Sequence, residues 1–187
     1  ITKQNNPQLL EKEWVEFELK FPDILPEKVE KFNSLIAEKY KLKTLKFNNK
    51  KEILPYVEPM FKLLDETYKT LSTYTPITDE QIKIYKEKYF NFIDKDYITC
   101  VADENNNLVA FAITMPSYSI ALQKAKGKLF PFGWWHLLQA TNKNDRANFY
   151  LIGIHPEYQR RGVTSIVFKA IQTNLKDKGI KILETNP

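Results

Sequence analysis

Residues 150–164 decide the fold, and they read Tyr150-Leu151-Ile152-Gly153-Ile154-His155-Pro156-Glu157-Tyr158-Gln159-Arg160-Arg161-Gly162-Val163-Thr164. The stretch opens as a continuous apolar strand and stops at Pro156, which has no N–H to donate to a neighbouring strand. A short basic loop follows and leads directly into a helix. The stretch therefore predicts a strand, a loop and a helix in immediate succession.

The helix predicted over residues 163–178 has one apolar face, which consists of Val163, Ile166, Val167, Ala170, Ile171 and Leu175. A helix that packs this face on a sheet points its N-terminus outward, where free N–H groups and the helix dipole attract anions. Gly162 lacks the Cβ that would keep a phosphate at a distance, and Arg160 and Arg161 add positive charge. The loop before this helix is therefore a predicted pyrophosphate site.

Hydrophobic periodicity predicts the other elements outward from this stretch. Alternation predicts a strand over 15–21, with Val15, Phe17, Leu19 and Phe21 on one face. The remaining expected elements are a helix from residue 26, a strand at 44–47, helices from 53 and from 78, a hairpin of strands 97–102 and 108–115, and strands 148–154 and 180–183. The order predicts an α/β domain with a largely antiparallel sheet.

This order, together with the loop, resembles the GNAT acetyltransferase superfamily in its bacterial-type members. That family carries an acetyl-CoA signature, Gln/Arg-x-x-Gly-x-Gly/Ala, after its fourth strand. Gln159 and Gly162 match the signature, whereas Thr164 departs from it at the last position. The elements from Thr44 to Leu183 match the family's first to fifth strands. The resemblance implies a GNAT acyl-CoA N-acyltransferase-like mixed, largely antiparallel sheet flanked by helices.

The resemblance also implies a division of the chain. Residues 1–43 form an N-terminal strand-helix extension, as the end of a preceding region, and residues 44–187 form the GNAT-like domain. Residues 116–147 are an insertion between the third and fourth strands. The chain does not start with Met and stops just after a strand, so we expect a fragment that lacks sequence on both sides.

The resemblance implies that acetyl-CoA is the acyl donor. In this family the fourth strand separates from the fifth, which frees backbone groups for the pantetheine arm and the thioester. The residues expected to bind the cofactor are Ile152, Gly153, Ile154, Gln159, Arg160, Arg161, Gly162, Val163 and Thr164. Glu184, at the end of the fifth strand, is the first candidate for the base that accepts the proton of the amine; a strand-end carboxylate in solvent is the alternative. The family's usual acid, a tyrosine after the fifth strand, would lie beyond residue 187.

The predicted insertion carries much apolar surface between residues 129 and 138, too much to remain in water as a mobile loop. We expect Phe132, Trp134 and Trp135 to line the pocket or entrance for the acceptor. A packed segment that only covers the core is the alternative. Aromatic rings at the entrance would favour an acceptor with an apolar or cationic body.

Composition limits the function classes. Cys100 is the single cysteine, so the chain has no internal disulfide and no cysteine-based metal site, and no metal is expected; Cys100, His136 and His155 are expected to be structural. No apolar run is long enough to span a membrane, and a reducing cytoplasm is expected. The net charge of +5 favours anionic partners, but the lysines are spread without the basic block of a nucleic-acid tail.

Three functions compete at this stage. The first is an N-acetyltransferase that transfers an acetyl group from acetyl-CoA to an amine of a small molecule or peptide. The second is a catalytically degenerate GNAT-like module that binds an acyl-CoA or a protein. The third, a nucleic-acid-binding domain, predicts binding that weakens steeply with salt. We favour the first, with no nucleic acid and no membrane as partners; the acceptor and the oligomeric state do not follow from the sequence.

Overall fold

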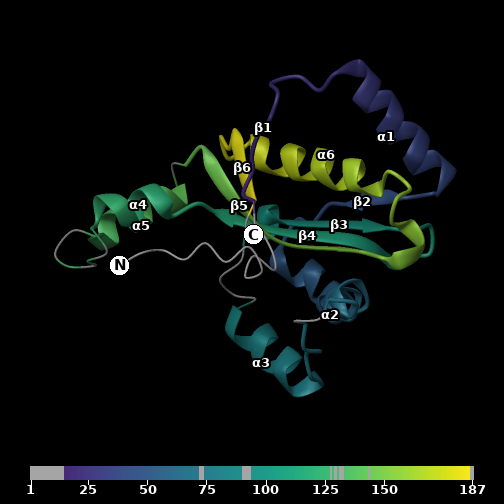
Figure 1. Cartoon of the computed structure of the whole chain (residues 1–187), viewed down its shortest axis with the longest axis horizontal. Helices are drawn as coiled ribbons and strands as arrows, with labels where there is room; N and C mark the ends of the chain where they lie inside the picture. The colour runs from purple at the N-terminus through teal and green to yellow at the C-terminus, as the bar shows by residue number, and fades with distance from the viewer. Residues whose placement is uncertain are drawn as a thin grey trace, which may run out of the picture.

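The computed structural model describes residues 15–71, 74–89, 94–126, 128, 130, 133–142 and 144–185. Of Tyr89, Gly133, His136, Thr141 and Asn142 it describes the backbone alone. A single sheet lies at the centre, with α1 (Glu27–Lys39) and α6 (Val163–Lys176) on one face and α2 (Leu54–Tyr68) and α3 (Asp79–Tyr89) on the other (Figure 1). This is the predicted α/β class.

The sheet has six strands in the order β1-β6-β5-β4-β3-β2. All neighbouring strands run antiparallel except β5 and β6, which run parallel. The prediction of a mixed, largely antiparallel sheet is therefore confirmed. The strands are β1 (Glu18–Lys20), β2 (Lys43–Leu45), β3 (Ile98–Ala102), β4 (Leu108–Pro116), β5 (Arg146–Ile154) and β6 (Ile182–Thr185).

The N-terminal strand differs from its prediction. Only Glu18–Lys20 forms a strand, and it pairs with β6 at the edge of the sheet. Val15 and Phe17 stay 55% and 61% exposed, so the alternation of apolar residues does not mark a buried face here. Strand β1 lies at the edge of the sheet and has a neighbouring strand on one side, β6. Few side chains of other elements are therefore available to cover its apolar face.

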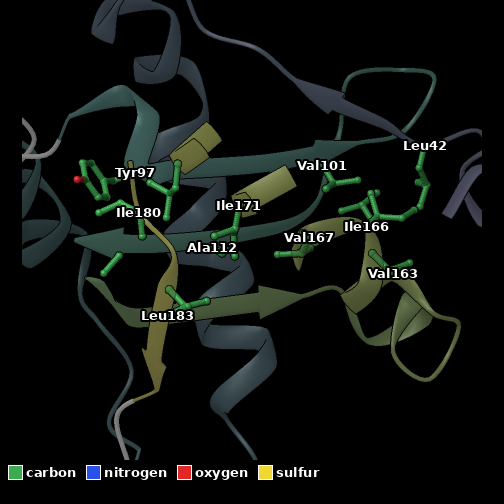
Figure 2. Packing of buried hydrophobic residues seen from close by; sticks show 14 residues of the cluster. Leu42, Tyr97, Val101, Ala112, Val163, Ile166, Val167, Ile171, Ile180 and Leu183 are labelled. Carbon is green, nitrogen blue, oxygen red and sulfur yellow. The ribbon is translucent and has the colours of Figure 1, made fainter. Parts of the chain in front are cut away.

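The face of the sheet that carries α6 holds a core in which the helix is packed as its sequence predicts (Figure 2). The six residues of its apolar face are all buried, and Val167 and Leu175 are 0% exposed. They pack against Val101, Ala110 and Ala112 of the sheet, among other residues. The helix that follows the predicted pyrophosphate loop is thus rigidly held on the sheet.

The opposite face of the sheet holds a second apolar cluster, built from α2 and from side chains of β3 and β4. Val57, Met60, Leu63 and Leu64 of the helix are buried, as is Phe111 of β4. Cys100 is 0% exposed in this cluster, and burial raises the pKa of its thiol, so its predicted structural role is confirmed. The short helix η2 (Lys50–Ile53) leads into α2.

Local capping fixes where α3 begins. The N–H of Thr78 donates to Oε1 of Gln81 at 2.9 Å, and the N–H of Gln81 donates to Oγ1 of Thr78 at 3.3 Å. This reciprocal pair is a capping box, and it accounts for the helix that the sequence predicts from residue 78. Between β4 and β5 the chain forms two helices, α4 (Ser119–Lys124) and α5 (Gly133–Asn142), which lie to one side of the sheet (Figure 1).

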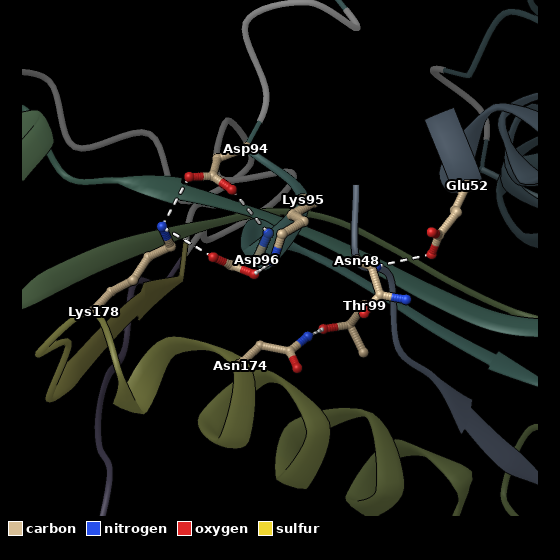
Figure 3. A network of polar contacts seen from close by, with 8 residues as sticks. All are labelled: Asn48, Glu52, Asp94, Lys95, Asp96, Thr99, Asn174 and Lys178. Carbon is tan, nitrogen blue, oxygen red and sulfur yellow. Dashed lines mark hydrogen bonds and ion pairs between the residues drawn. The ribbon is translucent and has the colours of Figure 1, made fainter. Parts of the chain in front are cut away.

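A polar network ties the end of α6 to the start of β3 (Figure 3). Nζ of Lys178 lies 2.8 Å from Oδ2 of Asp94 and 3.1 Å from Oδ2 of Asp96. One turn of α6 earlier, Nδ2 of Asn174 donates to Oγ1 of Thr99 at 3.3 Å. The short helix η3 (Lys95–Tyr97) is capped by Asp94, so these contacts also fix the entry into β3.

Among the helices of the described ranges, none is long and apolar enough to cross a membrane.

Candidate functional site

Strand β5 has two partners along its first part and one along its second. It pairs with β4 along its length, from Ala147 opposite Pro116 to Ile154 opposite Ala110. Its pairing with β6 ends where Phe149 faces Thr185. Within the described residues, 150–154 therefore have no strand on the β6 side, and the backbone groups that point there form a free edge.

A β-bulge lies where this free edge begins. Thr114 of β4 faces Phe149, and its neighbour Ile113 faces Leu151, so Tyr150 is the extra residue. A bulge bends its strand and increases the local twist. The bulge therefore bends β5 next to Phe149, which faces Thr185, the last residue of β6 that the structure describes.

Side chains from α2 and from the loop that follows β5 contact the free edge of β5. The hydroxyl of Tyr68 is hydrogen-bonded to the backbone of Ile152. Oγ1 of Thr67 donates to the carbonyl of Ile154 at 3.3 Å, and Nε2 of Gln159 donates to the same carbonyl at 3.0 Å. Burial raises the pKa of Tyr68, and the bond to Ile152 lowers it by a smaller amount, so the hydroxyl is protonated at neutral pH. The sequence predicts a helix from residue 53 that includes Tyr68, but it does not point to this contact.

Beyond β5 the chain forms the predicted basic loop and then α6. The short helix η4 (Pro156–Tyr158) begins the loop, and the ring Nδ1 of His155 accepts the N–H of Glu157 at 3.4 Å, a structural role. In the described part of the chain no acceptor lies within hydrogen-bond distance of the N–H groups of Gly162, Val163 and Thr164. A 14-residue helix therefore presents free N–H groups and its positive dipole end at the expected place.

The loop holds an unusual backbone conformation and carries positive charge. Arg160 and Gly162 have φ angles of 60° and 82°, in the left-handed region. For a residue with a Cβ this conformation costs about 1–2 kcal/mol, so packing around the loop must hold Arg160 in place. Arg160 and Arg161 are both exposed beside the free N–H groups. These charges make the start of α6 an anion site in electrostatic terms.

Helix α1 lies directly on this loop. A Cβ at Gly162 would stand 2.9 Å from Cζ of Phe32 and 3.3 Å from Cδ1 of Ile36. The guanidinium of Arg161 lies 5.5 Å from the ring centre of Tyr40. Gly162 is thus required by its φ angle and by the packing of α1. This differs from the reason that the sequence suggested, since the missing side chain would point at α1.

A groove of about 600 Å³ runs from the start of α6 along one flank of that helix. Gly162 and Thr164 line its end, and Phe168 and Lys169 line its middle. Its other wall comes from β1 and the segment that leads into α1, with Leu19, Phe21, Leu25 and Val29. The groove therefore joins the anion site to an elongated, mostly apolar surface on the same face of the sheet.

Glu184 lies on β6, opposite Asn148 of β5. Its Oε1 is 2.7 Å from a guanidinium nitrogen of Arg146, and its Oε2 accepts a hydrogen bond from Ser117 at 2.9 Å. Arg146 also pairs with Glu18 of β1, and these two carboxylates raise the pKa of its guanidinium. Both oxygens of Glu184 are thus engaged in contacts that join β1, β5 and β6. Oδ1 of the neighbouring Asn148 is buried without a hydrogen-bond partner in the described part of the chain.

The aromatic residues predicted to line an acceptor pocket lie apart from this site. Trp134 and Trp135 are 45% and 52% exposed on α5, with their rings edge to face at 5.9 Å. Phe132 lies outside the described residues. Residues 152–154 lie next to the loop of 159–164 in the structure. Helix α5, which carries the two tryptophans, lies away from that loop, to one side of the sheet (Figure 1).

Comparison with protein families gives one match over most of the chain. Residues 58–187 match the sequence model described as Acetyltransferase (GNAT) family. A search among curated proteins found no match. The matched range contains β3 to β6 and α6, and so includes the free edge and the basic loop.

Two solved structures with low sequence identity and TM-scores above 0.5 share the fold. A glucosamine N-acetyltransferase region of a fungal multi-domain β-N-acetylglucosaminidase has a TM-score of 0.52 at 13% identity, over 90% of this chain and 17% of that one. The C-terminal domain of a putative lysylphosphatidylglycerol synthetase from Agrobacterium fabrum has a TM-score of 0.51 at 10% identity, over 91% and 47% of the two chains. A putative phosphinothricin N-acetyltransferase has a TM-score of 0.48 at 17% identity, over 76% and 69%. The first two extend the likeness of fold into residues before 58.

Proposed function

Because the chain belongs to the GNAT acetyltransferase family, we propose that it transfers an acyl group, acetyl in the simplest case, from acyl-CoA to an amine of a small molecule or peptide. One observation carries the proposal. Among the described residues, 150–154 of β5 pair with β4 alone, and the strand continues into a loop that leads to N–H groups of α6 without a hydrogen bond. A single run of chain can therefore bond an extended thioester arm along its edge and a pyrophosphate at its end.

The proposal assigns roles to the residues of that run. The backbone of Ile152, Gly153 and Ile154 would bond the pantetheine arm and the thioester. The pyrophosphate would lie on the N–H groups of Gly162, Val163 and Thr164, with the guanidinium groups of Arg160 and Arg161 beside it and Gln159 holding the loop through Ile154. These are the cofactor residues expected from the sequence.

In the proposed reaction the neutral amine attacks the thioester carbon, a C–N bond forms, and the C–S bond breaks. The negative charge that develops on the thioester oxygen would be met by an N–H of the free edge, a contact worth about 3 kcal/mol in comparable sites. The N–H of Ile152 is the candidate, and the thioester oxygen would take the place of the Tyr68 hydroxyl, which is bonded to it in this structure. The amine loses its proton to a base, and the CoA sulfur leaves as a thiolate that must gain a proton.

Glu184 remains the proposed base, acting through water. Its contacts with Arg146 and Ser117 stabilise the charged carboxylate and also tie it to the sheet edge. Glu184→Gln keeps the size of the side chain and removes its charge. We expect kcat to fall while the affinity for CoA stays unchanged; equal kcat values would exclude Glu184 as the base.

The engagement of both Glu184 oxygens is also the observation that favours the second candidate, a module that binds acyl-CoA without turnover. The two candidates share the cofactor site and differ in one result. If the protein binds CoA but leaves every amine in a broad screen unmodified, it is the binding module.

The lining of the acceptor site by Phe132, Trp134 and Trp135 remains a proposal. Its test is the KM for the acceptor of a Trp134→Ala, Trp135→Ala variant.

The cofactor site is tested by a charge placed at the start of α6. Thr164 is exposed in the first turn, where Thr164→Glu should stabilise the helix by about 0.3–1 kcal/mol. The same carboxylate would compete with the pyrophosphate for the free N–H groups and repel it. We expect the affinity for CoA, measured by calorimetry, to fall at least about tenfold while the melting temperature does not fall.

Thr173→Glu is the matched control, because Thr173 is exposed on the same helix and the change of charge is the same. Its affinity for CoA should equal that of the wild type. Gly162→Asp is a poorer test, since any side chain there also meets Phe32. If Thr164→Glu binds CoA as tightly as the wild type, the pyrophosphate does not lie at this helix.

A further inference from the structure

A cavity of about 420 Å³ lies on the face of the sheet opposite α6. It is enclosed by α2, α3 and strands β3 to β5, and its volume falls in the range of small-molecule sites. The lining side chains that matter here are Leu64 of α2, Phe111 and Ile113 of β4, and Leu151 of β5. Lys86 is the one charged side chain among its lining residues.

The cavity adjoins the free edge of β5. Leu151 lines the cavity and immediately precedes Ile152, in the part of β5 that pairs with β4 alone among the described residues. On α2, Leu64 lines the cavity, and Tyr68, one turn later, is bonded to the backbone of Ile152. One strand and one helix thus supply both the cavity wall and the edge where the thioester is proposed to lie.

Glycine at position 153 shapes this junction. A Cβ there would overlap the ring of Phe111, with Cδ1 at 3.0 Å and a second ring carbon closer still. The absence of a side chain lets the Phe111 ring lie against β5, where it forms part of the cavity wall. The cavity therefore reaches the strand at the residue next to Ile152.

The apolar side chains that line the cavity favour an apolar ligand. A charged or strongly polar group placed among these side chains would lose its hydration without gaining a partner, whereas a hydrocarbon gains from burial. The methyl of an acetyl group would leave most of the cavity unfilled. An occupant must also connect to the free edge beside Leu151, and the acyl chain of the donor thioester begins there.

We infer that this cavity receives the hydrocarbon chain of the acyl donor, so that the protein uses CoA thioesters whose acyl chains are longer than acetyl. The inference rests on the proposed function, because it needs the thioester at the free edge of β5. The transfer step is unchanged: the amine nitrogen bonds to the thioester carbon and the CoA sulfur leaves. The length of the acyl group that moves is what the cavity determines.

The test uses the full chain and no acceptor. Affinities for CoA, acetyl-CoA, butanoyl-CoA, hexanoyl-CoA and octanoyl-CoA are measured by calorimetry under identical conditions. We expect the affinity to rise by up to about fourfold for each added CH₂ that enters the cavity, and to level off once the chain outgrows it. Because acceptor is absent, any dependence on chain length reports the donor alone.

A cavity-filling variant locates the effect. Ile113→Trp places an indole in the cavity and should remove the rise with chain length, while the affinities for CoA and acetyl-CoA stay as in the wild type. Leu45→Trp is the matched control: Leu45 packs on the same apolar cluster, is partly exposed, and is not among the residues that line the cavity. It should keep the wild-type dependence on chain length.

The outcomes separate this inference from the proposed function. Equal affinities for acetyl-CoA and octanoyl-CoA in the wild type would overturn the inference and leave CoA binding intact. A rise that persists in Ile113→Trp would also overturn it, by placing the chain elsewhere. If Ile113→Trp changes only the KM of an amine acceptor, the cavity belongs to the acceptor and the inference is wrong. If no CoA compound binds, the proposed function fails and the inference with it.

Discussion

The two faces of the sheet are covered by helices of similar apolar character, but they fill space differently. On the α6 face, Val163, Val167, Ile171 and Leu175 are at most 1% exposed and pack continuously against the strands (Figure 2). On the α2 face the buried cluster leaves a cavity of about 420 Å³. The groove of about 600 Å³ on the α6 face lies along the flank of α6, whereas this cavity lies between α2 and the strands.

The difference lies in the space between each helix and the strands. Helix α6 packs on the strands without a gap and is anchored by the polar network of Lys178 and Asn174, and the groove on this face runs along the flank of the helix (Figure 3). The α2 face keeps an open volume beside the free edge of β5. Substitutions on the two faces should therefore have different energetic consequences, even when the residue types are alike.

The largest expected effect is on the filled face. Ile171 is 1% exposed in the middle of α6. Ile171→Ala should lower the free energy of unfolding by about 2–5 kcal/mol, because the surrounding side chains cannot close the space that it leaves. A urea titration at pH 7 measures the change. A loss too small to detect would mean that α6 is not packed as described.

A pair of enlarging substitutions compares the faces directly. Val167 is 0% exposed, and Val167→Phe should cost about 1–3 kcal/mol through overpacking. Ile113→Trp adds bulk beside the cavity on the other face, where there is room for it. Its unfolding free energy should change by less than about 1 kcal/mol. Similar losses for both variants, measured in the same titration, would show that the two faces do not differ.

The smallest effect concerns the network at the end of α6. Burial alone would raise the pKa of Asp94, but hydrogen bonds from Lys178 and from the N–H of Asp96 outweigh it and lower the pKa below its usual value. A lowered carboxyl pKa contributes stability that is present above the unfolded pKa near ~3.9 and is lost as the pH falls through the folded pKa. Because Asp94 is 46% exposed, the contribution is at most about 1 kcal/mol.

Asp94→Asn tests this contribution. The variant should be less stable than the wild type at pH 7. The difference should begin to shrink near about pH 4 and shrink further as the pH falls through the lowered folded-state pKa of Asp94, where the wild-type carboxyl becomes protonated too. Unfolding free energies at several pH values between 7 and 3 give the comparison. A difference that stays constant over this range would show that the charge of Asp94 does not contribute.

Much of the fold follows from local patterns in the sequence. The apolar face of α6 was predicted residue by residue, because helical spacing and burial against a flat sheet require the same positions. The strand that ends at Pro156 and the capping box of Thr78 and Gln81 also depend only on neighbouring residues. The N-terminal strand was predicted too long, because alternation does not reveal whether any element covers that face.

The candidate site was only half visible in the sequence. The basic loop before α6 could be found, because its residues adjoin one another and match a family signature. The contact of Tyr68 with Ile152 could not, since 84 positions separate the two residues and tyrosine at an apolar helix position is ordinary core. The same limit applies to Phe32 on Gly162, which only the packing of α1 across α6 brings together.

The sequence by itself thus determined the order of strands and helices, the buried face of α6 and the charged loop that precedes it, since each depends on residues within one or two turns. The tertiary structure decided how the strands pair, which side chains meet the free edge of β5, and that an apolar cavity lies between α2 and the strands. These features arise from contacts between distant segments. Hydrophobic periodicity records that a side chain is turned inward, but it carries no information on whether the space it enters is filled.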